Sequence, residues 1–109
     1  ENLSYVQRRR LEIARDLASD PKLLLLDDPA AGMNEKETDS LYDLIKEVQK
    51  RGVTVLIIEH DMPLVMKLCD RITVLNFGEK LAEGTPEEIQ NNDSVIEAYL
   101  GTEEEDVLA

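Results

Sequence analysis

The sequence predicts an α/β fold in which parallel strands are joined by crossover helices. The first observation is the run from Leu23 to Leu26, four leucines that stop at Asp27 and Asp28. The second is an almost wholly apolar run from Val53 to Ile58, which also ends in polar residues. Neither run alternates, and this pattern is typical of strands that helices cover on both faces. The third observation is a helical pattern between the two runs, because strand, helix and strand make a right-handed crossover unit.

Composition limits the size and the partners of this fold. The 109 residues suffice for one compact domain, which we expect at residues 1–101, followed by a solvated acidic tail at 102–109. A net charge of -12 argues against nonspecific binding to nucleic acid or to anionic lipid. The single cysteine, Cys69, favours a reducing compartment, and no apolar run is long enough to cross a bilayer. The chain begins at Glu1 rather than at a methionine, which suggests a processed or excised piece.

The helices of the first half have clear start and stop signals. Ser4 is a suitable N-cap for a helix that continues to Ala18 and stops before Pro21. Asn34, with Glu37 three residues later, has the spacing of a capping box for the second helix, which should end at Arg51 and Gly52.

The second half is expected to hold a short helix capped by Asp61, a third strand at 71–75 and a hairpin partner at 80–82. Thr85, Pro86 and Glu88 form a capping-box sequence for a short helix that ends at Asn91. A last helix is expected at 94–100.

Three residues at strand ends could carry chemistry. Asp27 and Asp28 suit Mg²⁺, which prefers carboxylate oxygens together with substrate phosphates. His60, the only histidine, follows the other strand of the same crossover unit. Each has a plain structural explanation, as a polar strand exit or as a structural histidine. The two observations strengthen each other, because the carboxyl ends of parallel strands meet at one edge of the sheet, where active sites of open α/β sheets lie.

The helix start at Ser4 to Gln7 offers backbone N–H groups and a hydroxyl to an anion. Taken alone, an ordinary N-cap is the simpler interpretation of this segment.

Together these pieces resemble the C-terminal half of an ATP-binding cassette (ABC) ATPase subunit, a P-loop NTPase-like fold of the ABC type that here lacks its N-terminal half. Leu3, Ser4, Tyr5, Val6 and Gln7 resemble the signature motif, and the strand ending at Asp27 and Asp28 resembles Walker B. Residues 31–34, with Gly32 and Asn34, match the D-loop, and His60 matches the switch histidine. The sequences of residues 29–34 and 58–62 are most similar to those of ATPase subunits of branched-chain amino-acid importers.

The resemblance implies roles for these residues. Asp27 would hold Mg²⁺ through its water shell, Asp28 would polarise the attacking water, and His60 would sense the γ-phosphate of ATP. The signature residues 3–7, with Gly32 and Asn34, would bind nucleotide in a head-to-tail dimer with a second ATPase subunit. Permease subunits in the membrane would hold the protein at the cytoplasmic, inner face of the membrane, and the missing N-terminal half would complete the domain.

Three departures from the family pattern lead us to expect that the isolated chain is nearly inactive. No G-x-x-x-x-G-K-[ST] loop occurs in the sequence, so the chain lacks the glycine-rich segment that would bind the β- and γ-phosphates of ATP. Asp28 stands where active members have glutamate, and Val6 stands where they have glycine. A branched side chain at position 6 would block close approach of the γ-phosphate, and it would strain the backbone if φ were positive there.

Two other interpretations stay open at this point. A phospho-acceptor receiver domain would also place an aspartate at a strand end, but its second acidic site and its lysine are not evident. A non-enzymatic interaction module would need none of the missing parts. In either case a partial sheet would leave apolar surface uncovered, which favours association.

Overall fold

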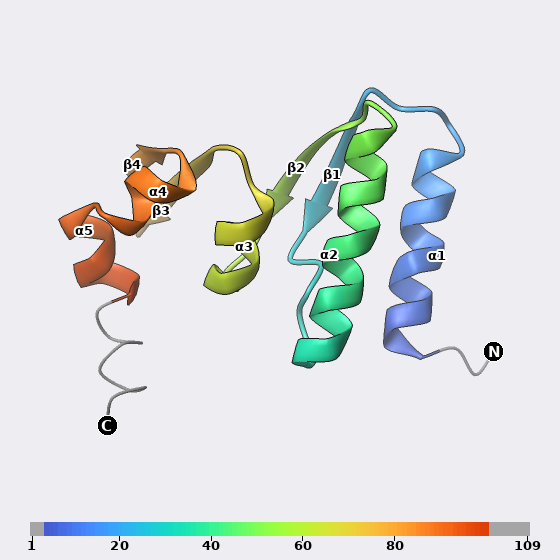
Figure 1. Cartoon of the computed structure of the whole chain (residues 1–109), viewed down its shortest axis with the longest axis horizontal. Helices are drawn as coiled ribbons and strands as arrows, with labels where there is room; N and C mark the ends of the chain where they lie inside the picture. Colours follow the sequence, from blue (N-terminus) through green and yellow to red (C-terminus); the bar gives the residue numbers. More distant parts are fainter. Residues whose placement is uncertain (1–3, 101–109) are drawn as a thin grey trace. The chain divides into compact units, whose positions relative to one another are not determined.

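The computed structural model describes residues 4–100, apart from the side chain of Leu100, and its helices alternate with strands as far as the hairpin in the second half of the chain (Figure 1). Leu3 and the acidic tail at 102–109 lie outside the described residues. In chain order the elements are α1 (Tyr5–Leu17), β1 (Leu23–Asp27), α2 (Glu35–Lys50), β2 (Thr54–Ile58), α3 (Met62–Leu68), β3 (Ile72–Asn76), β4 (Glu79–Gly84), α4 (Pro86–Gln90), α5 (Asp93–Val95) and a π-helical turn at Ile96–Leu100.

These elements fall into two compact units. One unit ends at Leu64 and contains α1, β1, α2 and β2, and the other begins at Val65 and contains the β3–β4 hairpin, α4 and α5. The single partial domain expected over residues 1–101 stays a prediction.

Side-chain caps fix the starts of three helices, as the sequence predicts. The Ser4 hydroxyl accepts the N–H of Gln7 at 3.1 Å, and the Ser4 N–H donates to the Gln7 side chain at 2.9 Å. Asn34 and Glu37 form the same reciprocal pair at the start of α2, and Thr85 with Glu88 does so at α4. Each capping residue satisfies a backbone donor that the helix leaves free, and this stabilises the helix by about 1 kcal/mol.

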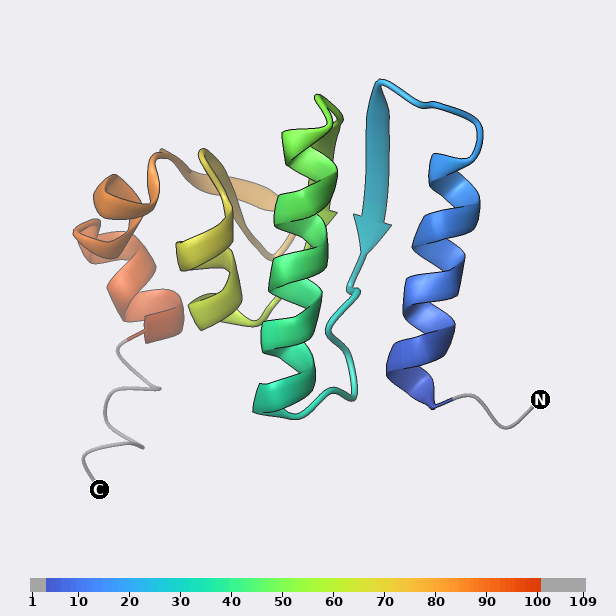
Figure 2. The same ribbon diagram turned by 45° about the vertical axis from the view of Figure 1, so that its right-hand side comes forward.

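The crossover unit forms as predicted. β1 and β2 pair in parallel, with Leu23 opposite Thr54 and Asp27 opposite Ile58. Helices α1 and α2 pack side by side, and α2 packs on β2 (Figures 1 and 2). The core of this unit consists of apolar side chains from both helices and one face of the strands: Ile13, Leu24, Leu26, Leu41, Ile45 and Val48.

The expectation that both strands are buried on both faces is wrong for this chain. Leu24 and Leu26 are buried, whereas Leu23 and Leu25 are 52% and 62% exposed. Leu56 and Ile58 on β2 are likewise more than half exposed. The reason is that the helices cover one face of the strand pair, while the described residues leave the other face open to solvent. Four leucines in a row gave no sign of this, because their periodicity is the same whether one face or both are covered.

The second unit is built on an antiparallel hairpin. β3 pairs with β4 from Ile72 opposite Gly84 to Asn76 opposite Glu79. Phe77 and Gly78 make the turn with φ of 52° and 78°, the left-handed values that a tight two-residue hairpin turn requires. The hairpin confirms the expected pairing, although β3 begins one residue later and β4 extends further than the pattern predicts.

Candidate active site

The ends of β1 and β2 bring Asp28 and His60 together. The Nδ1 atom of His60 lies 3.0 Å from Oδ1 of Asp28. The two residues are separated by a whole helix in the sequence, and the parallel register places them side by side because Asp27 pairs with Ile58. The structure therefore places both predicted catalytic residues at one edge of the sheet, which is the placement that the sequence predicts.

The backbone at Asp28 has an unusual conformation. Its φ is 52°, in the left-handed region that aspartate enters more readily than most side chains do. The Asp28 N–H extends the sheet by donating to the Ile58 carbonyl at 2.6 Å, and the Asp28 carbonyl accepts the N–H of Ala31 at 3.2 Å. The sheet therefore ends at Asp28, and the chain turns sharply there. Oδ1 of Asp28 is shielded from solvent and makes no hydrogen bond of good geometry with any described residue, although His60 is close.

A third residue, Glu59, belongs to this site and was missed as a site residue by the sequence analysis. Its side chain is only 1% exposed. Oε2 accepts the N–H of Ala30 at 2.9 Å, and Oε1 accepts the N–H groups of His60 and Asp61 at 3.0 and 3.3 Å. The signal that could have found it is a carboxylate that directly continues an apolar strand, because a charge there is buried only if backbone donors satisfy it.

The donor set determines which residue could hold a cation. Ligand atoms of Asp28, Glu59 and His60 lie within 4.8 Å of one another. Both oxygens of Glu59 already accept backbone N–H groups, and a histidine nitrogen is a poor ligand for Mg²⁺. Glu59 is therefore better suited to accept backbone hydrogen bonds than to bind magnesium. Asp27, with an exposed carboxylate at the end of β1, fits Mg²⁺ chemistry better.

The residues of the expected signature motif lie at the start of α1. Ser4 is the N-cap, Tyr5 is 44% exposed, and Gln7 is bonded to Ser4. The guanidinium of Arg9 donates a hydrogen bond to the Tyr5 hydroxyl at 2.7 Å. Among the described residues, no hydrogen bond or ion pair joins the segment 4–7 to Asp28 or His60. Leu3 lies outside the described residues.

The structure corrects the expectation that Val6 could strain the backbone. Val6 lies in the first turn of α1 and is not among the described residues with positive φ. A valine therefore costs no left-handed strain at this position. Its branched side chain would still be an obstacle to an approaching phosphate.

The loop from β1 to α2 contains the other two predicted binding residues. Gly32 has φ of 78°, and Asn34 ends the loop as the N-cap of α2, with its side-chain oxygen 2.8 Å from the Glu37 nitrogen. The Asn34 oxygen is thus committed to the helix, whereas Gly32 provides the left-handed bend that the loop requires.

The known proteins that this chain is similar to are described as ATP-binding proteins of transporters. Residues 79–105 match the family described as "Branched-chain amino acid ATP-binding cassette transporter". The chain is 57% identical over 101 residues to the high-affinity branched-chain amino acid transport ATP-binding protein LivG of Salmonella typhimurium, covering 92% of this chain and 40% of that protein. It is also 57% identical to BraF of Pseudomonas aeruginosa, which has the same description, over 91% of this chain and 39% of that protein.

Solved structures agree with the sequence comparison. An ATP-binding cassette of an ABC transporter in its ADP conformation superposes with a TM-score of 0.82 at 31% identity, over 92% of this chain and 41% of that one. The expected resemblance and the ABC-type fold class are thereby confirmed. The chain spans about 40% of the length of the curated relatives that it matches. Within the described residues, no helix is long and apolar enough to span a membrane.

Proposed function

Because this chain is similar to ABC transporter ATP-binding subunits in both sequence and fold, we propose that it supplies part of an ATPase site that powers import of branched-chain amino acids. The observation that carries the proposal is the 3.0 Å approach of His60 to Asp28 at the ends of two parallel strands. A carboxylate and an imidazole at one sheet edge can position a water molecule and a phosphate. Catalysis of phosphoryl transfer consists largely of such positioning, together with electrostatic stabilisation.

In this proposal, each residue keeps the role that the resemblance implies. Asp28 accepts a hydrogen bond from the attacking water, and His60 donates one to the γ-phosphate. Bound Mg²⁺ would neutralise phosphate charge, and the exposed carboxylate of Asp27 would hold it through water. Ser4 to Gln7, with Leu3 before them, would face ATP on a second ATPase subunit, and Gly32 and Asn34 would line the contact between the two subunits.

The partners follow from the parts that this chain does not contain. Its sequence has no phosphate loop, so tight ATP binding requires a segment that supplies one, as the N-terminal part of the family domain does. Permease subunits would hold the assembly at the cytoplasmic face of the membrane. Alone, the chain should bind Mg-ATP weakly and turn it over slowly.

One observation favours a second function, a purely interacting module. Leu23, Leu25, Leu56 and Ile58 form an exposed apolar face on β1 and β2. Such a face suits a partner protein whether or not catalysis takes place. Binding and hydrolysis of Mg-ATP by a chimera with a longer relative separate the two functions.

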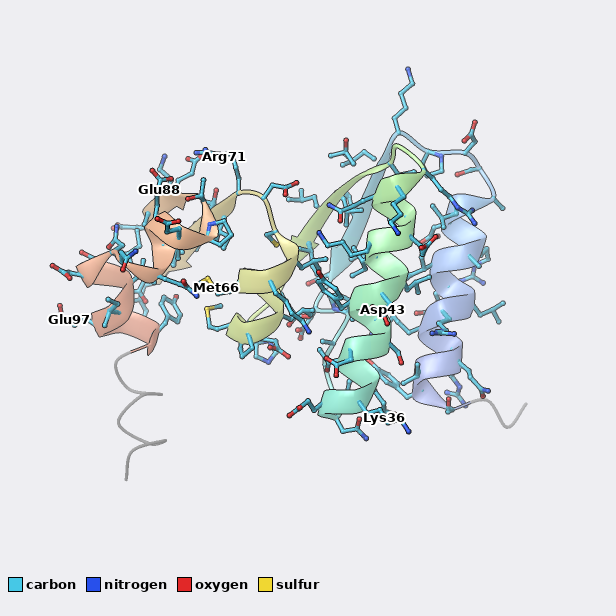
Figure 3. All side chains as sticks on the ribbon, in the orientation of Figure 1. Lys36, Asp43, Met66, Arg71, Glu88 and Glu97 are labelled. Atoms are coloured by element: carbon cyan, nitrogen blue, oxygen red, sulfur yellow. The ribbon has the colours of Figure 1, made fainter. Side chains whose placement is uncertain are left out.

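The test is a chimera in which this chain replaces the matching C-terminal part of the Salmonella typhimurium relative. We expect the chimera to bind Mg-ATP by isothermal titration and to hydrolyse it slowly, while the chain alone binds it far more weakly and is nearly inactive. His60→Ala and Asp28→Asn should abolish hydrolysis in the chimera. Asp43→Asn, an equal loss of charge at an exposed position of α2, serves as the matched control and should change neither quantity (Figure 3).

A folded chimera that does not bind Mg-ATP would contradict the ATPase proposal and favour the interaction module. Micromolar binding of Mg-ATP by the chain alone would also contradict it, because a phosphate site would then exist without a phosphate loop.

A further inference from the structure

We propose that Glu59 is a positioning residue that clamps the loop after β1 to the loop after β2 and thereby holds Asp28 against His60. This inference rests on the proposed function for its catalytic meaning, whereas the clamp itself can be tested without ATP. The functional roles considered so far do not use Glu59, yet it is the most deeply buried carboxylate of the site, with a side chain 1% exposed.

The clamp is built from three backbone donors. One oxygen of Glu59 accepts the N–H of Ala30, two residues after Asp28. The other accepts the N–H groups of His60 and Asp61. A single carboxylate thus bridges two loops that are 29 residues apart in the sequence, and each bonded N–H group lies within two residues of Asp28 or His60.

Burial makes this bridge strong. Backbone donors next to a buried carboxylate form charge-assisted hydrogen bonds, which are about twice as strong as neutral ones. Losing an acceptor would leave a donor unsatisfied, at a cost that the loops could relieve only by moving apart. A further hydrogen bond fixes the loop after β2. Oδ1 of Asp61 accepts the N–H of Leu64 at 3.1 Å and so attaches the far end of this loop to α3.

Glu59→Gln is the sharpest variant. A glutamine has one carbonyl oxygen and one NH₂ group, so in either orientation its NH₂ faces a backbone N–H that cannot accept a hydrogen bond. The shape of the side chain is retained and only one half of the bridge is lost. Glu47→Gln is the matched control, since Glu47 is exposed on α2 and loses the same charge.

The first measurement uses the chain itself and its single histidine, which gives one unambiguous set of imidazole NMR signals. Asp28→Asn should shift the His60 signals in the otherwise unchanged chain and in the Glu47→Gln background. In the Glu59→Gln background the same substitution should produce less than half of that shift. A purely structural Glu59 would lower the melting temperature and leave the shift intact, and that result would overturn the proposal.

The second measurement needs no variant and so remains informative if Glu59→Gln fails to fold. The Ala30 amide proton should exchange with solvent at least tenfold more slowly than that of Gly32 in the same loop. Equal exchange rates would contradict the clamp.

The third measurement tests catalysis in the chimera. Misplacement of reacting groups by about 1 Å can cost on the order of 100-fold in rate, so Glu59→Gln should lower kcat about 10- to 100-fold while KM for Mg-ATP changes less than twofold. An unchanged kcat would remove the positioning role. A chimera without any ATPase activity would overturn the proposed function and leave the NMR results to decide the clamp.

Discussion

Asp28 has an unusual backbone conformation and is also the residue proposed to polarise the attacking water. Its left-handed φ of 52° is tolerated by aspartate, whose short polar side chain suits that region, and less readily by glutamate. The family resemblance implies glutamate at this position in active members. The aspartate therefore fits the turn that the structure shows and sets its carboxylate back by one methylene, about 1 Å, from where a glutamate would reach.

At the residue scale, we predict that Asp28→Glu in the chimera raises turnover by up to about 100-fold. The reason is that the longer side chain brings the carboxylate closer to the attacking water. Steady-state hydrolysis at saturating Mg-ATP measures the effect, and Asp43→Glu, which adds the same methylene at an exposed site, is the control. Turnover that stays at the level of the unchanged chimera would show that the length of the side chain is not what limits the rate.

The capping box of α4 is the clearest example at the scale of an element. Gly84 is buried, and a Cβ atom there would lie 2.6 Å from Oε1 of Glu88, so a larger residue at the end of β4 would displace the oxygen that forms the cap. That oxygen accepts the Thr85 N–H at 2.8 Å. The Thr85 backbone bond, then its side-chain bond and the charge of Arg71, lower the pKa of Glu88 below its usual 4.5; Figure 3 shows Arg71 and Glu88 in the hairpin unit.

This lowered pKa predicts how the stability of the hairpin unit depends on pH. In the unfolded chain Glu88 has its ordinary pKa, so the stabilisation is complete above about pH 4.5 and is lost as the pH falls through the lower folded value. Glu88→Gln keeps an acceptor of the same shape but does not titrate. We therefore expect it to reduce the loss of melting temperature between pH 7 and pH 3, as followed by circular dichroism.

Glu97→Gln is the control for that experiment, because Glu97 is exposed in the same unit and is not part of a capping box (Figure 3). It should keep the pH dependence of the unchanged chain. If Glu88→Gln melted with the same pH dependence as the unchanged chain, the cap would not be the source of the acid sensitivity.

At the scale of the whole molecule, the open face of β1 and β2 dominates the expected behaviour in solution. Leu25 and Leu56 are cross-strand partners on this face and are 62% and 56% exposed. Covering a large aliphatic side chain contributes about 1.5 to 3 kcal/mol, so a partner surface that covers several of them would bind well.

We predict that the purified chain self-associates through this face and that Leu25→Lys reduces the association. A lysine in the middle of the face would have to be desolvated in any apolar contact. Sedimentation velocity over a range of concentrations measures the change. Gln90→Lys, which adds the same charge at an exposed position of α4, should associate like the unchanged chain. A monomer at every concentration would rule out the prediction.

Local signals in the sequence determined most of the elements and the position of the site. Caps such as Ser4, Asn34 and Thr85 act within four residues, so their effect can be predicted without a tertiary structure. The meeting of Asp28 with His60 was also predictable, because parallel strands joined by a crossover helix must end at the same edge.

Only the tertiary structure decided two other properties: which face of β1 is covered, and the burial of Glu59. The physical reason is the same for both. Each depends on groups that are distant in the sequence or on a surface supplied from elsewhere, and a run of leucines or a carboxylate after a strand has the same local pattern whatever lies against it. Short-range preferences fix the elements of this protein, and long-range contacts fix what each side chain does in it.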